Sequence, residues 1–362
     1  MLKRLIFWLI LLAVISAIPA YLKRAEIALA VMERGSLTRM LEQPLADLGD
    51  GLHVALCGAG GPLPDRNRSG PCVAVAAGKR LFIVDAGSGG VRNLGLMNYP
   101  VGDIEAVFLT HYHSDHLDGL GEMATIRWVQ GSHTTPLDVY GPTGVADVVS
   151  GFNQVYARDA IFRNQHHGDR VAPLSGHGMV ARQFATPLGS NAVRVFDQDG
   201  IKIDSFLVDH APVSPAVGYR FRYKGRTVVI SGDTSRSPNL EKFSSNADLL
   251  VHSGLSPELV GIINRAALIT NNSTVAKISR DILDYHSSPL DAAETARDAG
   301  VKHLLFYHVV PPLPLPGMDA AWLDGVSVIF PHYTLGRDGT VISLPAASGE
   351  VNVVSRGFRL AF

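Results

Sequence analysis

The stretch His111-Tyr112-His113-Ser114-Asp115-His116 decides how this sequence is interpreted. It follows the apolar run Ala106–Leu109, which is typical of a strand, and precedes Gly119-Leu120-Gly121. Zinc binds imidazole nitrogens and carboxylate oxygens, and a catalytic zinc site keeps one position open for water. Three histidines and one aspartate so close together cannot all point one way from a strand or a helix. A tight loop can bring them together on two adjacent metal ions.

Three more predicted strands end in residues that can bind metal. Asp233 lies in a glycine turn after the run Thr227–Ile230, where its carboxylate is placed to bridge two cations. His210 follows Phe206–Val208, and His308 follows Val301–Tyr307. Either histidine alone is more typical of a strand-end residue with an ordinary hydrogen bond. Together with the first motif, they predict a single metal centre.

Composition indicates a folded globular protein of the α/β class. The chain has 362 residues, of which 46% are apolar and 18% charged, enough for a sizeable core. A formal net charge of −1 gives no overall sign of nucleic-acid binding. Strands interspersed with helices predict layers stacked around a sheet core. Further strands are expected at His53–Leu56, Val73–Ala76, Leu81–Val84 and Val217–Arg222, and helices at Val145–Tyr156 and Pro289–Ala299.

The N-terminus differs from the rest of the chain. Lys3 and Arg4 precede an apolar run, Leu5–Leu22, which is near the minimum length for crossing a bilayer and is apolar on every side. We therefore expect residues 1–35 to form a signal anchor and stalk, and residues 36–362 to form the catalytic domain. This predicts a bacterial inner-membrane protein with a single N-terminal anchor in the lipid bilayer and a periplasmic catalytic domain. The alternative is a cleaved signal and a free periplasmic enzyme.

The two cysteines, Cys57 and Cys72, are too few for a disulfide framework or a cysteine-rich zinc site. They flank one loop between two predicted neighbouring strands. A single disulfide in an oxidising compartment and two buried thiols are both compatible with this spacing.

The motifs together resemble the metallo-β-lactamase superfamily, and most closely its ribonuclease Z-like branch, which includes tRNA 3′-processing endonucleases, arylsulfatases and phosphodiesterases. The resemblance covers roughly residues 51–345 and implies a four-layer αββα sandwich with two zinc ions per chain. Iron or manganese could substitute, because such sites discriminate weakly among these metals. The motifs that carry it are Cys57–Pro62, Asp85-Ala86-Gly87, the His111–His116 loop, His210 with Gly218-Tyr219-Arg220, Gly232-Asp233-Thr234, His286-Ser287-Ser288 and His308.

The resemblance assigns a role to each of these side chains. It implies that Asp85 hydrogen-bonds a ligand histidine and so fixes that ring. Asp115, which is also a ligand, and His286 are the expected catalytic residues, His286 as the donor of a proton to the leaving group. The implied ligands are His111, His113 and His210 for one zinc, Asp115, His116 and His308 for the other, and Asp233 as the bridge.

Two departures from the family pattern bear on the substrate. Ser253 stands where the family commonly has a glutamate that supports the donor histidine. The long flexible arm of the tRNA-processing members is also missing, because Arg220 runs directly into the next strand at Thr227. We therefore expect a small anionic ester, such as a phosphodiester, as the substrate, and do not expect nucleic acid as a partner. A tRNA 3′-processing activity, a carboxylic ester, thioester or lactone hydrolase, and a homodimer stay open as alternatives.

Overall fold

The computed structural model describes residues 4–6, 8, 21–42 and 45–355. The chain divides into two compact units, Met1–Pro44 with Arg359–Phe362, and Leu45–Phe358. In the first unit, helix α2 (Arg24–Leu41) has no buried residue. The stalk that the sequence predicts up to residue 35 overlaps this helix.

The predicted membrane anchor has no support from the described residues. Most of the apolar run, residue 7 and residues 9–20, lies outside the part of the chain that the structure describes. Among the residues that are described, no helix combines the length and the apolar character that crossing a bilayer requires.

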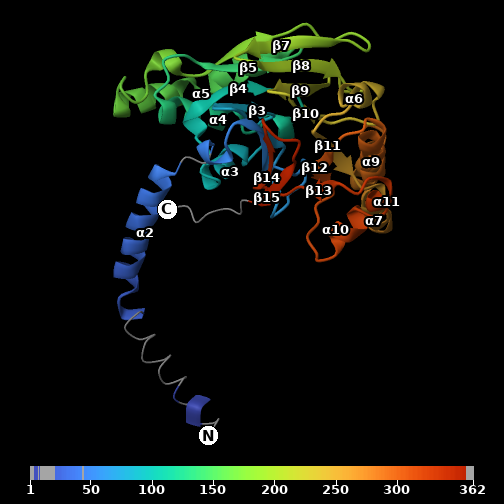
Figure 1. The fold of residues 1–362 in the computed structure, drawn as a ribbon, viewed down its shortest axis with the longest axis horizontal. Coiled ribbons are helices and arrows are strands. Elements are labelled where there is room, and N and C mark those ends of the chain that lie inside the picture. Colours follow the sequence, from blue (N-terminus) through green and yellow to red (C-terminus); the bar gives the residue numbers. More distant parts are fainter. Residues whose placement is uncertain (1–3, 7, 9–20, 43–44, 356–362) are drawn as a thin grey trace. The chain divides into compact units, whose positions relative to one another are not determined.

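The second unit contains two sheets (Figure 1). The first sheet has the strand order β15-β14-β1-β2-β3-β4-β5-β6, and the second has the order β13-β12-β11-β10-β9-β8-β7. The strands of the first sheet are β1 (Gly51–Gly58), β2 (Cys72–Ala77), β3 (Arg80–Val84), β4 (Ile104–Phe108), β5 (Leu137–Gly141), β6 (Met179–Gln183), β14 (Thr340–Pro345) and β15 (Asn352–Ser355). Those of the second are β7 (Ala192–Gln198), β8 (Ile201–Leu207), β9 (Val217–Tyr223), β10 (Arg226–Ile230), β11 (Leu249–Leu255), β12 (His303–Val310) and β13 (Tyr333–Leu335).

The two sheets pack face to face, and helices cover their outer faces. One apolar cluster joins the sheets, with Phe82 and Phe108 from the first meeting Phe221 from the second. A second cluster packs α3 (Gly90–Leu96), α4 (Leu120–Gly131) and α5 (Val145–His167) on the first sheet. A third packs α6 (Pro238–Phe243), α9 (Pro289–Asp298), α10 (Met318–Trp322) and α11 (Val326–Ile329) on the second sheet. This is the α/β architecture expected from the sequence, with helical layers outside two sheets.

Local sequence explains where several helices begin. Helices α6, α9 and α7 (Pro257–Ile269) each start with a Ser-Pro pair. The serine accepts a hydrogen bond from a backbone N–H of the first turn, and the proline occupies a position where its missing N–H costs nothing. Helix α7 packs against α8 (Ser273–Asp281). Helix α5 is longer than the sequence indicated, since it runs on from Tyr156 to His167.

The cysteines are joined as a Cys57–Cys72 disulfide. It links the end of β1 to the start of β2 and closes the glycine-rich loop between them. Both cysteines are fully buried against the helices of the first sheet. Of the two states that the sequence left open, the structure contains the disulfide.

Candidate metal centre

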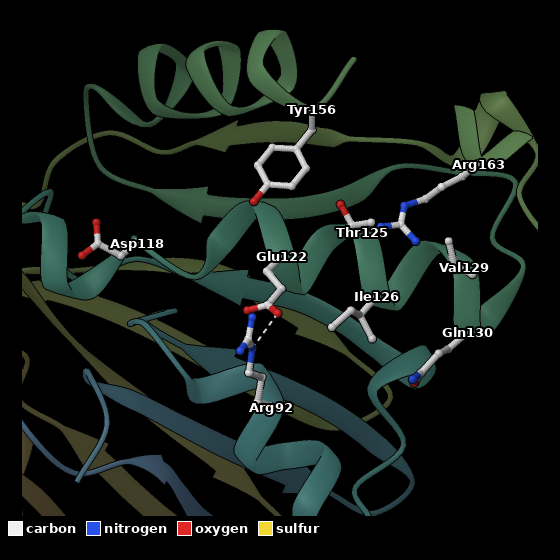
Figure 2. Close-up of a pocket in the computed structure, with 9 residues that line it drawn as sticks. All are labelled: Arg92, Asp118, Glu122, Thr125, Ile126, Val129, Gln130, Tyr156 and Arg163. Carbon is white, nitrogen blue, oxygen red and sulfur yellow. Dashed lines mark hydrogen bonds and ion pairs between the residues drawn. The ribbon is translucent and has the colours of Figure 1, made fainter. Parts of the chain in front are cut away.

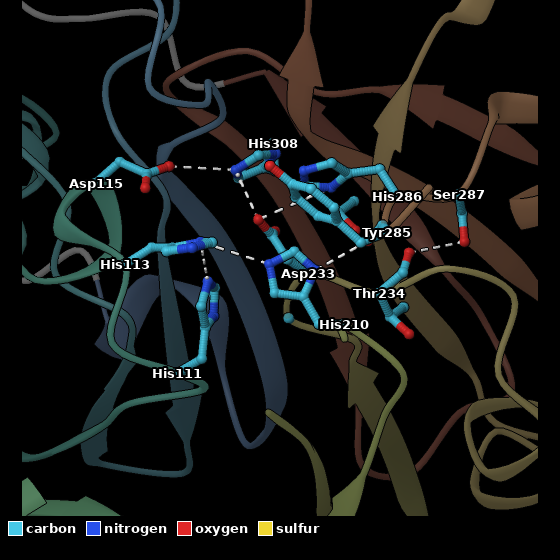
Figure 3. Close-up of polar contacts among 12 residues, drawn as sticks. His111, His113, Asp115, His210, Asp233, Thr234, Tyr285, His286, Ser287 and His308 are labelled. Carbon is cyan, nitrogen blue, oxygen red and sulfur yellow. Dashed lines mark hydrogen bonds and ion pairs between the residues drawn. The ribbon is translucent and has the colours of Figure 1, made fainter. Parts of the chain in front are cut away.

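Eight side chains that could hold a metal ion meet at one edge of the two sheets, and most of them are labelled in Figure 3. The loop after β4 carries four of them, because β4 ends at Phe108 and the chain then turns through the 3₁₀ helix Ser114–His116. The turn after β10 carries Asp233, and the segment after β8 carries His210. The sequence had expected all of these residues at strand ends, and the structure brings them together.

His308 reaches the same centre through an irregularity in β12. The pairing of β11 with β12 shifts between Ser253 and Gly254, so that Tyr307 and Val309 have partners and His308 lies in a bulge. Its φ is +45°, a conformation that is costly for a residue with a side chain. The N–H of Val309 donates to the carbonyl of Ala59 (2.9 Å), which holds the bulge in place. The bulge turns the imidazole toward the donors from the other strands.

Seven of these side chains form two adjacent groups, and the eighth, His286, lies in a third group with Asp233 and His308. In the first, His113 Nδ1 lies 3.1 Å from His111 Nε2 and 3.5 Å from His210 Nε2, and Asp233 is close to all three. The second group consists of Asp115, His116 and His308. Asp233 also lies next to the second group, since its Oδ2 is 3.3 Å from His116 Nε2 and 3.1 Å from His308 Nε2. A single carboxylate therefore lies between two sets of donors.

These residues fit a pair of divalent cations. Both the Nε2 of His116 and one carboxylate oxygen of Asp233 are buried without a hydrogen-bond partner among the described residues, which is costly unless a ligand satisfies them. Burial lowers the pKa of His111 far below its ordinary value and also lowers that of His210. Both rings are then neutral near pH 7, and the neutral imidazole is the form that coordinates a metal.

The carboxylates around the second group favour a bound positive charge. Burial opposes protonation of His116 and His308, but the neighbouring carboxylates together outweigh burial and raise the pKa of both rings. These carboxylates are Asp233 and Asp85 at His116, and Asp233 and Asp115 at His308. Where no metal is bound, a proton on these imidazoles therefore offsets the carboxylates. A zinc ion would replace that proton, since metal binding displaces protons from its ligands.

Asp85 and Thr110 orient two of the imidazoles. The carboxylate of Asp85 accepts hydrogen bonds from His116 Nδ1 (2.8 Å) and from the backbone N–H and the hydroxyl of Thr110 (both 2.8 Å). The Thr110 hydroxyl also lies 3.0 Å from His111 Nδ1. Asp85, at φ +59°, thus contacts one ligand ring directly and reaches a second through Thr110. The sequence singled out Asp85 but gave no signal for Thr110, because a threonine at a strand end is common.

His210 is oriented by a backbone group. Its Nδ1 donates to the carbonyl of Tyr285 (2.9 Å), which leaves Nε2 free to face the donors. The Tyr285 ring packs against both His210 and His286 (Figure 3). The sequence missed Tyr285, and no pattern could have revealed it, because every residue has a carbonyl.

His286 lies beside the donors on a loop that is firmly held. The N–H and hydroxyl of Ser287 both donate to the carbonyl of Thr234 (2.8 and 2.9 Å), and Ser288 caps helix α9. The imidazole has its Nδ1 4.0 Å from Asp233 Oδ2 and stacks on His308. Burial lowers the pKa of His286 to about 3, so the ring is neutral near pH 7. The hydroxyl of Ser253, the residue where the sequence departs from the family pattern that it resembles, has no hydrogen-bond partner in the described part of the chain.

A pocket of about 520 Å³ lies between α3, α4 and α5 (Figure 2). Its lining includes the cations Arg163 and Arg92. Arg163 pairs with Asp159, and Arg92 in the same pocket pairs with Glu122. With Asp118 also at its edge, the pocket has no excess of positive charge and is a poor match for a phosphate.

Comparison with known proteins identifies the family. The model of the metallo-β-lactamase superfamily matches residues 65–298. The chain belongs to this superfamily. A ribonuclease Z of Mycobacterium sp. (strain KMS) is 33% identical over 292 residues, which span 79% of this chain and 94% of that protein. A ribonuclease Z of Mycobacterium bovis (strain BCG / Pasteur 1173P2) is 34% identical over 273 residues, which span 75% of this chain and 90% of that protein.

The metallo-β-lactamase fold is also evident in solved structures. The short form of human tRNase Z aligns with a TM-score of 0.59 at 22% identity, covering 81% of this chain and 99% of that one. The chain is thus a metal-dependent hydrolase of ester bonds, in the ribonuclease Z-like branch of the superfamily. The superfamily's usual cofactor is a pair of zinc ions, and the donor groups described above suit it.

These relatives correct two expectations from the sequence. The prediction of a catalytic domain anchored in a lipid bilayer on the periplasmic side was wrong, because the relatives that match most of this chain are named ribonuclease Z. Their name also counts against the expectation that nucleic acid is not a partner. That expectation rested on the missing arm, the weak net charge and the predicted membrane anchor. A net charge says nothing about how charge is distributed over the surface.

Proposed function

We propose that the chain is a dinuclear zinc phosphodiesterase that cleaves RNA as ribonuclease Z does, with precursor tRNA as the substrate class. The observation that carries the proposal is the likeness to ribonuclease Z over 94% of a relative's length. The fully assembled donor set supports it, since a protein that had lost catalysis would have no need of it.

The proposed ligands follow the two donor groups. His111, His113 and His210 would hold one zinc ion, Asp115, His116 and His308 would hold the other, and Asp233 would bridge them. When bound, two zinc ions lower the pKa of a shared water and offset charge on the phosphate oxygens.

Side chains of the protein are proposed to orient the metal ligands and to supply the proton for the leaving group. The Asp85–Thr110 pair keeps the rings of His116 and His111 in one orientation, which limits reorganisation during the reaction. His286 is proposed to donate a proton to the leaving oxygen. A phosphodiester anion next to its ring would raise the low pKa that burial imposes.

A second candidate function is hydrolysis of a small phosphodiester. The hairpin between β9 and β10 favours it, since only Lys224 and Gly225 join the two strands and no arm for gripping a folded RNA leaves the sheet there.

The test compares substrates on one protein preparation. Zinc-loaded protein is incubated with a labelled precursor tRNA that carries a 3′ trailer and, separately, with bis(nitrophenyl) phosphate, a lactone and a thioester. We expect site-specific removal of the trailer and hydrolysis of the small diester. Cleavage of the diester without the tRNA would favour the second candidate, and activity on the lactone or thioester alone would reject both.

A further inference from the structure

Basic side chains gather on the outer face of β9, β8 and β7, the last three strands in the order of the second sheet. Figure 1 shows where these strands lie. Ile203 of β8 and Phe221 of β9 point into the core between the sheets. Because side chains alternate along a strand, their neighbours Lys202, Asp204, Arg220 and Arg222 point outward. Arg194 of β7 pairs with Asp204 across the hairpin and shares this face. We call Arg194, Lys202, Arg220 and Arg222 the arginine face.

A buried carboxylate fixes the three guanidinium groups. Asp204 accepts hydrogen bonds from Arg194 Nε (2.5 Å), Arg220 Nη2 (2.9 Å) and Arg222 Nη2 (2.8 Å), and its side chain is only 5% exposed. Burial would raise the pKa of Asp204, but the hydrogen bonds from Arg194 and Arg220 and the charge of Arg222 hold it below its ordinary value. The Arg220 guanidinium also lies over the ring of Phe243 on α6, 5.2 Å from its centroid. The three groups are therefore held in place before any ligand binds.

The arginine face retains unused hydrogen-bond donors. A guanidinium has five N–H groups, and each arginine here gives no more than two of its nitrogens to Asp204 and Asp197. Arg194 and Arg222 remain about a third exposed, with side-chain exposures of 35% and 38%. In the part of the chain that the structure describes, the three arginines pair with two carboxylates, Asp197 and Asp204, so the four cations of this face outnumber them. Fixed, outward donors with net positive charge are the arrangement that binds phosphate groups.

We infer that the arginine face binds the phosphate backbone of the RNA substrate, at a distance from the cleavage site. The inference rests on the proposed function and deepens it. Strand β8 leads from Asp204 toward His210, a separation of six residues or at most about 20 Å of extended chain. An RNA body held on this face could therefore reach the metal centre with one end. The face supplies phosphate contacts that a short β9–β10 hairpin cannot, and a small diester would not need them.

The experiment measures RNA binding and its salt dependence. The probe is a labelled RNA hairpin with a 3′ trailer, titrated with full-length zinc-loaded protein at several salt concentrations. The double variant Arg220→Gln/Arg222→Gln should raise Kd at least about tenfold and reduce the slope of log Kd against log salt by about 2, one for each lost phosphate contact. Hydrolysis of bis(nitrophenyl) phosphate reports whether the variant is folded.

Matched variants control for charge and for folding. Arg236→Gln/Arg297→Gln removes two ion-paired arginines on other elements and should leave Kd and slope unchanged. Lys202→Gln removes an exposed cation that does not contact Asp204, so it tests the face even if the arginine double variant does not fold, and it should reduce the slope by about 1.

The outcomes separate this inference from the proposed function. If Kd and slope are unchanged in both Lys202→Gln and the arginine variant, the arginine face does not bind RNA. This conclusion holds even if the wild-type protein removes the 3′ trailer. RNA binding that the face variants weaken, in a wild-type protein that leaves the trailer uncut, would support the face and reject the proposed function. No RNA binding by wild-type protein would overturn both.

Discussion

The loop His111–His116 and the loop Tyr285–Ser288 bring imidazoles to the same centre by different means. In the first loop the rings themselves are fixed, because Asp85 and Thr110 bond the nitrogens of His116 and His111 that face away from the donors. In the second loop the backbone is fixed through Thr234, and the imidazole of His286 packs against the rings of His210 and His308, with its Nδ1 4.0 Å from Asp233 Oδ2. Rings locked in one orientation suit permanent metal ligands. The ring of His286 contacts other rings, and the carboxylate of Asp233 lies beyond hydrogen-bond distance from it. Such a ring is suited to gaining and losing a proton.

Replacing Asp233, the carboxylate shared by both donor groups, should have the largest effect. Asp233→Ala should reduce hydrolysis to background and lower the zinc content below two per chain, because both groups lose a donor. Metal analysis and activity on bis(nitrophenyl) phosphate measure this, and circular dichroism checks the fold. Substantial activity in this variant would show that the assignment of the bridge is wrong.

His286→Ala tests the second loop. If His286 supplies a proton, turnover should fall about 10²–10⁴-fold with little change in KM. The loss should shrink for a nitrophenolate leaving group, which needs no proton, and zinc content should stay the same. The structure also places His286 in a donor group with Asp233 and His308. A loss of zinc, with equal losses on good and poor leaving groups, would make His286 a ligand and remove the contrast between the loops.

Asp85→Asn tests the first loop, where we expect a smaller effect. Loss of a group that orients a metal ligand typically costs about 10–100-fold in metal affinity or activity, so zinc affinity measured by competition with a chelator should fall by that amount.

Asp248→Asn is the matched control for Asp85→Asn. Asp248 is also a buried carboxylate that accepts a strand N–H, from Thr227 at 2.8 Å, but it pairs with Arg226 and Lys302 and contacts no histidine. Equal losses of zinc affinity in the two variants would mean that Asp85 acts only on the fold.

The smallest expected effect is a pH dependence of folding stability that arises from His252, a histidine in neither loop. It is fully buried, and burial lowers its pKa to about 4. Between pH 6.5 and 4 the unfolded chain takes up a proton that the folded protein refuses, so folding stability should fall across this window, by at most about 3 kcal/mol, and should not change above it. Denaturant melts of wild type and His252→Gln at pH 7 and pH 5 measure this. The variant should show a smaller difference, and an identical difference would place the acid sensitivity elsewhere.

The residues of the metal centre were readable from the sequence because their chemistry is local. A strand followed by His-x-His-x-Asp-His is improbable as an ordinary surface loop, and Asp233, His210 and His308 each follow an apolar run that is typical of a strand. The sequence also located most strands, since short β-type runs bounded by glycine, proline or aspartate stand out. It misjudged the length of α5, where polar residues after Tyr156 obscured the helical pattern.

Other features depended on distant parts of the chain and could not be read from any one segment. The bulge at His308 exists because Ala59, far away in the sequence, accepts the next N–H. The Tyr285 carbonyl orients His210 only once the two loops are adjacent. Similarly, the formal charge of −1 concealed the arginine face, because a sum over the chain discards position. The sequence by itself determined which atoms could bind metal and roughly where strands end. The tertiary structure decided which of those atoms share a centre, how each ring is turned and where the positive charge gathers, because these properties arise from packing between segments that are far apart in the chain.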